Sequence, residues 1–331
     1  MIRPKLRQEW LQKQFPGAAI KIEVASADAS FRHYFRVAVA NQTFILMDAP
    51  PEHEDCKPFV AVAQIFAEAG AHVPTVLAQD LEQGFLLLTD LGSTTYLAAL
   101  NQENADALYR DAIDALINIQ LASRPDVLPV YDSALLMREM RLLPEWYIGK
   151  HLQRTLTDAQ SQVLELVFAR LVQNNLAQGK VYVHRDYHSR NLMVTQPNPG
   201  ILDFQDAVYG PVTYDLVSLF KDAYITWEED RVLDWVIRYW DKAKKAGLPV
   251  APDFADFYQD FEWMGVQRHI KVLGVFARLY YRDGKAGYLK DMPLVSDYLR
   301  KTCKRYNALA PLINLLDELE GTAETGTGYT F

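Results

Sequence analysis

The chain has 331 residues, of which 50% are hydrophobic and 23% are charged, and it carries a formal net charge of −8. This length and composition predict one large or two modest domains with a sizeable hydrophobic core. The acidic charge argues against non-specific nucleic-acid binding and against a polybasic membrane anchor, because both need clustered Lys and Arg.

The cysteines and the hydropathy exclude further classes of protein. Cys56 and Cys303 lie far apart and form no CxxC pair, which argues against a disulfide framework and against a thiolate zinc site. No apolar run reaches the roughly 20 residues that span a bilayer, and the basic N-terminus lacks the apolar segment of a secretory signal. We therefore expect a cytoplasmic protein that binds neither membrane nor nucleic acid, as a monomer or weak dimer.

Strands dominate the beginning of the chain. Runs of β-branched and aromatic residues between turn formers predict five strands, over 20–25, 33–40, 42–49, 75–80 and 84–92. Between the third and fourth of these, residues 56–70 have a helical pattern that ends at Gly70. We expect a small sheet with one helix.

Helices dominate after Gly92. Apolar residues at helical spacing predict helices over 104–121, 157–178, 213–224, 228–246, 253–282 and 294–308. The clearest, 157–178, has a capping box of Thr157 and Gln160, with Gly179 as its C′ residue. Short strand-like runs lie at 181–183, 192–194 and 200–204. The prediction is an α+β fold with a β-rich N-terminal lobe, a mainly helical C-terminal lobe and a short tail, over residues 1–90, 91–320 and 321–331.

The polar segment VYVHRDYHSRNLMV, residues 181–194, carries the chemistry. Asp186 is placed to accept the proton of an attacking hydroxyl, while Asn191 and Asp203 offer hard oxygen ligands for Mg²⁺. A His-Arg-Asp triplet alone is a common chance match, and loop Asp and Asn residues often serve turns. Asn191 five residues after Asp186, and Asp203 twelve further on, favour a phosphoryl-transfer site.

Other reaction classes lack their motifs. The chain has no G-x-x-x-x-G-K-[ST] phosphate loop and no G-x-S-x-G nucleophile elbow. His184 and His188 are not accompanied by the Cys or Glu spacing of a zinc site.

The segment resembles the protein-kinase-like superfamily, in its small-molecule branch of aminoglycoside phosphotransferases and choline kinases. That branch has the form H-x-D-x-H-x-x-N, with His188 where protein kinases usually carry Lys, and Asp203-Phe204 is followed here by Gln205 instead of Gly. The resemblance implies a two-lobed protein-kinase-like fold, ATP and Mg²⁺ as cofactors, and a part for His188 in the reaction. It also implies that Asp215, in GPVTYDLVSL, braces the catalytic loop.

Further segments are similar to the bacterial kinases of cell-wall sugar recycling. They include DASFRHYFRV, LLLTDLG and QRHIKVLGVFARLYYRDGKAGYL, and the likeness spans roughly residues 25–290. It implies that the chain uses ATP to phosphorylate the C1 hydroxyl of N-acetylmuramate and N-acetylglucosamine in peptidoglycan recycling.

Two features depart from the superfamily pattern. The turn ASADASFRHYF has no glycine, although its small residues Ala29 and Ser30 could let backbone N–H groups approach phosphates. The third strand has Met47 and Asp48 where the phosphate-binding lysine is usual. The positive charge could come instead from a neighbouring basic residue, either Arg32, His33 or Arg36.

The remaining site residues follow from the resemblance and from residue type. The nucleotide base is expected at LTDLG, against the backbone of Thr89, Asp90 and Leu91. The sugar is expected to meet planar polar and aromatic side chains, although Trp146 could equally serve the core and His269 a helix end. The candidates for sugar contact are Trp146, Gln205, Asp206, Arg268 and His269.

Two alternatives stay open at this point. One is a kinase of the same fold for another small alcohol, such as an aminoglycoside or choline, which would need several carboxylates or an aromatic cage. The other is a non-catalytic nucleotide-binding regulator, suggested by the missing lysine and glycines.

Overall fold

The computed structural model describes residues 2–27 and 31–321, and it divides the chain into two compact units. Unit 1 comprises residues 1–122 and 184–207, and unit 2 comprises residues 123–183 and 208–331. This division differs from the predicted boundary after residue 90. The His-Arg-Asp segment belongs to the unit that contains the sheet, although it follows residue 180 in the chain.

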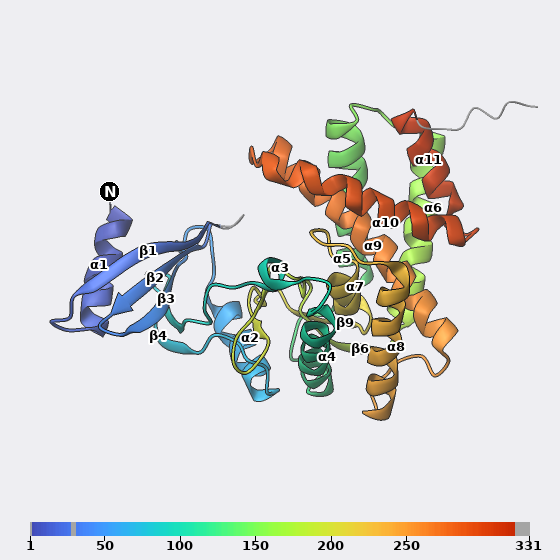
Figure 1. The fold of residues 1–331 in the computed structure, drawn as a ribbon. Helices are drawn as coiled ribbons and strands as arrows, with labels where there is room; N and C mark the ends of the chain where they lie inside the picture. Colours follow the sequence, from blue (N-terminus) through green and yellow to red (C-terminus); the bar gives the residue numbers. More distant parts are fainter. Residues whose placement is uncertain (1, 28–30, 322–331) are drawn as a thin grey trace, which may run out of the picture. The chain divides into compact units, whose positions relative to one another are not determined.

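The core of unit 1 is a five-stranded antiparallel sheet with the strand order β1-β2-β3-β5-β4. All five predicted strands are confirmed, and the predicted helix α2 (Lys57–Glu68) joins β3 to β4. Figure 1 shows the strands in blue and cyan. Their bounds are β1 (Ile20–Ala27), β2 (His33–Val39), β3 (Gln42–Asp48), β4 (Val76–Asp80) and β5 (Phe85–Thr89).

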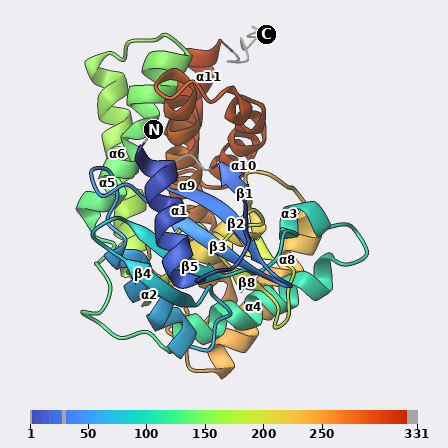
Figure 2. The same ribbon diagram turned by 90° about the vertical axis from the view of Figure 1, so that its left-hand side faces the viewer.

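Helix α1 (Ile2–Gln14), which the sequence analysis did not predict, packs on this sheet (Figures 1 and 2). Trp10 and Leu11 are buried in one cluster with strand residues, and the Trp10 ring lies 5.6 Å from that of Phe85. Arg3 and Arg7 both pair with the buried carboxylate of Asp48 on β3. Asp48 therefore fastens α1 to the third strand.

The rest of unit 1 consists of two helices, two short strands and the loops that connect them. Helix α4 confirms the prediction for 104–121, whereas the strand-like runs at 192–194 and 200–204 shorten to two residues each. These two strands pair antiparallel, with Leu192 opposite Ile201. The elements are α3 (Tyr96–Ala99), α4 (Ala105–Leu121), β7 (Leu192–Met193) and β8 (Gly200–Ile201).

Unit 2 is mainly helical, and the five helices predicted within it are confirmed to within a few residues at most ends. Its long helix α9 packs against η1, α10, α7 and α6. A π-helix, η1, and several shorter elements were not predicted. The elements are α5 (Ser133–Met140), η1 (Leu143–His151), α6 (Asp158–Ala177), β6 (Lys180–Val183), β9 (Val208–Pro211), α7 (Tyr214–Phe220), α8 (Glu229–Lys245), α9 (Phe254–Tyr281), the 3₁₀-helix η2 (Ala286–Asp291), α10 (Met292–Arg305) and α11 (Ala310–Glu320).

Helix α6 shows one correct and one wrong prediction of an end. The capping box is confirmed, because Thr157 Oγ1 accepts from the Gln160 N–H at 3.2 Å and Gln160 Oε1 accepts from the Thr157 N–H at 2.9 Å. Gly179 is not a left-handed C′ residue; Gln178 ends the helix in an extended conformation. A Cβ at Gly179 would lie 2.0 Å from the Pro249 carbonyl oxygen, so close packing requires the glycine.

Helix α9 also contains a glycine at a close approach. A Cβ at Gly274 would lie 2.4 Å from the carbonyl carbon of Leu142, at the start of η1. The two backbones can approach this closely only because Gly274 has no side chain. In the described part of the chain, every helix falls short of the length and apolarity that crossing a membrane requires.

Candidate active site

The segment from His184 to Ala207 is held by hydrogen bonds to other parts of unit 1. The N–H of Leu97 donates to the Ser189 carbonyl over 2.9 Å, and the Tyr187 hydroxyl donates to the Ala112 carbonyl over 2.8 Å. Further along, the Asn198 amide donates to Asp111 over 2.7 Å. These hydrogen bonds therefore fix the position of the segment relative to helices α3 and α4.

His184 joins the two halves of the segment. It is fully buried, and its Nδ1 accepts from the backbone N–H of Asp186 at 3.2 Å. Its Nε2 lies 2.9 Å from the Leu202 carbonyl oxygen, which can only accept, so Nε2 carries the proton of a neutral ring. The imidazole thereby fixes the backbone at Asp186 relative to the residue before Asp203.

Asn191 is oriented by the same part of the chain. Its Nδ2 donates to the Asp186 carbonyl over 3.0 Å and lies 3.3 Å from Asp203 Oδ2. Its backbone N–H donates to the His188 carbonyl, and its carbonyl accepts from the Leu202 N–H, both over 2.9 Å. Because Nδ2 is committed to these partners, Oδ1 is the amide atom that can bind a cation.

Asp203 and Gln205 complete a set of oxygen donors. Gln205 Nε2 donates to Asp203 Oδ1 over 2.8 Å, which orients the Gln205 amide. Gln205 Oε1 is buried and has no hydrogen-bond partner among the described residues. Carboxylate and amide oxygens are the donors that Mg²⁺ prefers, so Asn191, Asp203 and Gln205 fit this cation. Within the described ranges no three His, Cys, Asp or Glu side chains converge on a metal position.

Two residues of the segment have backbone conformations that side chains disfavour. Arg185, directly before Asp186, has φ +78°, and Asp203 has φ +63°. Non-glycine residues in the left-handed region cost about 1–3 kcal/mol each and persist only where the surrounding structure imposes them. Arg185 is held in part by its Nη1, which donates to the Asp206 carbonyl over 3.3 Å. Such strain is typical of functional sites.

Aromatic side chains of α2 pack against the segment from His184 to Ala207. The Phe59 and Phe204 rings lie 4.8 Å apart between centroids, and Phe66 lies 5.9 Å from Phe204 and 6.2 Å from His184. Phe59, Phe66 and Phe204 are all buried. This packing holds His184 and the backbone next to Asp203 on a rigid apolar base.

The predicted hinge is fixed by an arginine of β2. Arg36 donates from Nε to Asp90 Oδ2 over 2.7 Å, from Nη2 to Oδ1 over 3.0 Å, and from Nη2 to the Gly92 carbonyl over 2.7 Å. Burial would raise the pKa of Asp90, but hydrogen bonds from Arg36 and from the Gly92 N–H hold it below its ordinary value. Arg36 is thus committed to the hinge. The base contacts of Thr89, Asp90 and Leu91 stay a prediction.

Burial alone would lower the pKa of Arg32, the first of the cationic candidates, but Tyr34, Glu54, Asp206 and Asp203 raise it above its ordinary value. Arg32 pairs with Glu54, a residue that the sequence analysis did not single out, with Nη2 and Oε2 separated by 2.9 Å. The third candidate, His33, is exposed and lies opposite Asp48 in the β2–β3 register. Ala29 and Ser30 lie outside the described residues.

The other predicted residues belong to unit 2, where the structure places most of them in the interior. Asp215, Arg268 and His269 are all less than 5% exposed, and Trp146 is partly buried against the core. His269 stacks on Tyr298, and burial is the main cause that lowers the His269 pKa to about 3. Their proposed roles toward the sugar and the catalytic loop stay predictions.

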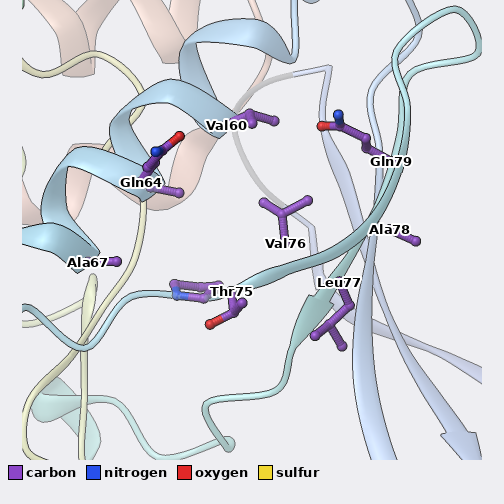
Figure 3. A pocket seen from close by; sticks show the side chains of 10 residues that line it. Val60, Gln64, Ala67, Thr75, Val76, Leu77, Ala78 and Gln79 are labelled. Atoms are coloured by element: carbon purple, nitrogen blue, oxygen red, sulfur yellow. The ribbon is translucent and has the colours of Figure 1, made fainter.

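Unit 1 also has a pocket whose lining residues include none of the predicted site residues. It has a volume of about 500 Å³ and lies between α2 and β4 (Figure 3). Its walls are apolar or uncharged, with Val60 and Gln64 on the helix and Val76 and Gln79 on the strand. None of its lining residues is ionisable, so it lacks groups for acid–base or metal chemistry.

Comparison with known proteins agrees with this geometry. The chain is 50% identical over 329 residues to an N-acetylmuramate/N-acetylglucosamine kinase of Neisseria meningitidis, covering 98% of both chains. It is 52% identical to a Pseudomonas putida protein of the same name, covering 91% of this chain and 89% of that protein. A crystal structure of the ADP-bound aminoglycoside phosphotransferase APH(2'')-Ib has a TM-score of 0.57 at 17% identity, covering 88% of this chain and 95% of that one.

These likenesses confirm the predicted kinase-like α+β fold and the predicted class of enzyme. The sequence model of the phosphotransferase enzyme family matches residues 21–254, which include all but the first residue of the sheet of unit 1 and the whole segment from His184 to Ala207. The chain belongs to the phosphotransferase enzyme family.

Proposed function

We propose that the chain transfers the γ-phosphate of ATP to the anomeric hydroxyl of N-acetylmuramate and N-acetylglucosamine, for peptidoglycan recycling in the cytoplasm. The observation that carries the choice of sugar is the 50% identity to the Neisseria meningitidis kinase over 98% of both chains. The hydrogen-bonded group of Asp186, Asn191 and Asp203 supports the reaction type independently of that likeness.

Asp186 is the proposed general base. Its carboxylate takes the proton of the C1 hydroxyl as the sugar oxygen bonds to the γ-phosphorus and the bond from that phosphorus to the β–γ bridging oxygen breaks. ADP leaves with that electron pair. The His184 ring and the Asn191 amide hold the Asp186 backbone from two sides, which limits the motion of the carboxylate.

The proposed cation ligands are Asn191 Oδ1 and the carboxylate of Asp203, with Gln205 Oε1 directly or through a water molecule. Bound Mg²⁺ supplies charge neutralisation on the phosphate oxygens. Gln205 was expected at the sugar, but its hydrogen bond to Asp203 favours a role beside the cation. Asp206 is exposed and follows directly, so it stays a candidate for the sugar.

The test is phosphorus NMR of a reaction that contains ATP, Mg²⁺ and either sugar. The expected product is a sugar 1-phosphate whose phosphorus couples to the anomeric proton. A phosphate elsewhere on the ring would refute the anomeric assignment, and turnover of choline or an aminoglycoside in place of both sugars would refute the sugar assignment.

Two modified sugars sharpen this test. The methyl glycoside of N-acetylglucosamine has no free C1 hydroxyl and should not be phosphorylated, whereas 6-deoxy-N-acetylglucosamine should remain a substrate. Phosphorylation of the glycoside would mean that the enzyme uses another hydroxyl. Complete inactivity of the wild-type chain on every acceptor would favour the regulatory alternative.

A further inference from the structure

The predicted phosphate site brings negative charges together without the usual lysine. Asp186, Asp203 and Asp206 lie in one segment that would also receive a triphosphate. Among the residues of the five-stranded sheet that the structure describes, Lys21 is the single lysine; its side chain is 75% exposed and pairs with Glu23 across 2.6 Å. A cation for the phosphates must therefore come from outside this sheet or from an arginine.

The third strand cannot supply this cation. Met47 is fully buried and apolar, and Asp48 carries negative charge that Arg3 and Arg7 neutralise. Arg36 of the second strand is committed to Asp90 and the Gly92 carbonyl.

Arg32, just before β2, is fixed in place by an ion pair. Its side chain is 13% exposed and that of Glu54 is 14% exposed, with 2.9 Å between Nη2 and Oε2. A partly buried pair of this kind holds its geometry better than an exposed pair such as Lys21 and Glu23, which salt and side-chain freedom weaken.

The charge environment of Arg32 connects it to the predicted metal ligands. Burial would lower the pKa of Arg32, yet the pKa is raised, because Tyr34 and Glu54, followed by Asp206 and Asp203, favour the charged form. The positive charge of the guanidinium is therefore stabilised by Asp203, the carboxylate that would hold the cation.

Glu54 is itself anchored, through the loop between β3 and α2. Its N–H donates to the Pro50 carbonyl over 3.0 Å, and the N–H of Ala49 at the start of this loop donates to the Gly84 carbonyl over 2.8 Å. A second contact lies next to the ion pair. The rings of Phe31 and His53 stack with their centroids 4.5 Å apart and an angle of 24° between their planes. Two adjacent residues before β2 thus meet two adjacent residues of this loop.

We propose that Arg32 contacts the β- and γ-phosphates of the nucleotide and that Glu54 is the positioning residue that holds its guanidinium. The pair replaces the lysine of the third strand and its glutamate partner on the following helix. This inference rests on the proposed use of ATP, but it does not depend on which acceptor is phosphorylated.

Calorimetric titration with AMP, ADP and a non-hydrolysable ATP analogue in Mg²⁺ tests the contact without any sugar. Arg32→Met should leave AMP affinity within about threefold and weaken the ATP analogue roughly 10²-fold, the upper scale of losing a hydrogen bond between charged groups. Glu54→Gln should give the same pattern at about tenfold, the lower range seen when a supporting residue is lost. Lys21→Met and Glu23→Gln, in an exposed pair of the same sheet, should bind all three nucleotides like the wild type.

The charge swap Arg32→Glu with Glu54→Arg separates a phosphate contact from a merely structural ion pair. It restores opposite charges but places a carboxylate where the phosphates bind, so binding of the ATP analogue should stay lost while thermal stability recovers. Restored nucleotide binding in the swap, or equal weakening of AMP and the ATP analogue in Arg32→Met, would overturn the proposal. A wild-type chain that binds ATP but phosphorylates neither sugar would contradict the proposed function and leave this measurement intact.

Discussion

Two buried glycines on α9 predict opposite responses to the same substitution. A Cβ at Gly274 would lie 2.4 Å from the Leu142 carbonyl carbon and 2.6 Å from its oxygen, and these are backbone atoms that cannot rotate away. A Cβ at Gly265 would find its nearest neighbours, on Lys221 and Val217, at 3.7 Å, which is ordinary van der Waals contact. Gly274→Ala should therefore destabilise unit 2, and Gly265→Ala should stabilise it.

The magnitudes follow from two terms. Alanine is favoured over glycine in a helix interior by about 1 kcal/mol, which alone sets the expected gain of about 0.5–1 kcal/mol for Gly265→Ala. At Gly274 the clash forces α9 and η1 apart at a cost of about 3 kcal/mol, at the upper end of overpacking. The net loss in the free energy of unfolding is then about 2 kcal/mol.

Urea unfolding followed by tryptophan fluorescence, together with thermal scans, measures both variants. Gly274→Ala should lower Tm by about 4–8 °C and Gly265→Ala should raise it by about 1–4 °C, for a unit of this size. Equal Tm values for the two variants would refute the close approach of α9 to Leu142. Because each variant is the control for the other, a general effect of Gly→Ala on α9 cannot imitate the result.

Three further predictions concern the site and the buried histidine. Asp186→Asn should lower kcat by roughly 10²–10⁴-fold while calorimetric ADP affinity is retained; near-normal turnover would refute its role as base. Gln205→Met should raise the Mg²⁺ concentration for half-maximal activity about tenfold, and an unchanged Mg²⁺ titration would remove Gln205 from the cation site. Burial lowers the pKa of His269 to about 3 from 6.5, so below pH 6.5 the unfolded chain binds a proton that the folded chain excludes. Stability should therefore fall as pH drops from 6.5 toward 3, and urea midpoints of His269→Gln should fall less steeply; an equal slope would contradict this.

Local patterns in the sequence were sufficient to predict most of the helices and strands. The five strands, α2, α4, α6, α8 and α9 all have periodic apolar residues and end signals that act within a few residues. Helix α1 was not predicted, although Leu6 and Trp10, four residues apart, both pack in the cluster on the sheet. Its Arg3 and Arg7, which contact the aromatic rings of Phe85 and Phe35, made the segment look basic and polar. The π-helix η1 depends on packing against α9, so no pattern within residues 143–151 indicates it.

The site shows the same division between local and distant information. Asp186, Asn191 and Asp203 could be predicted from spacing, because one continuous segment carries all three. The partners of Arg32 and Arg36 could not be found this way, since Glu54 and Asp90 are separated from them by loops and strands. The missing lysine of the third strand was the useful signal, because it indicated that the positive charge for the phosphates must come from other residues.

Unit 1 is discontinuous, and this has a consequence for synthesis of the protein. Residues 1–122 leave the ribosome well before residues 184–207, which complete the same unit. Until Phe204 and His184 arrive, the α2 rings of Phe59 and Phe66 lack the partners that bury them. A nascent chain therefore exposes an apolar surface during this interval, the state in which growing chains aggregate or recruit chaperones. The segment proposed to carry the catalytic residues is also the last piece needed to close the sheet-containing unit.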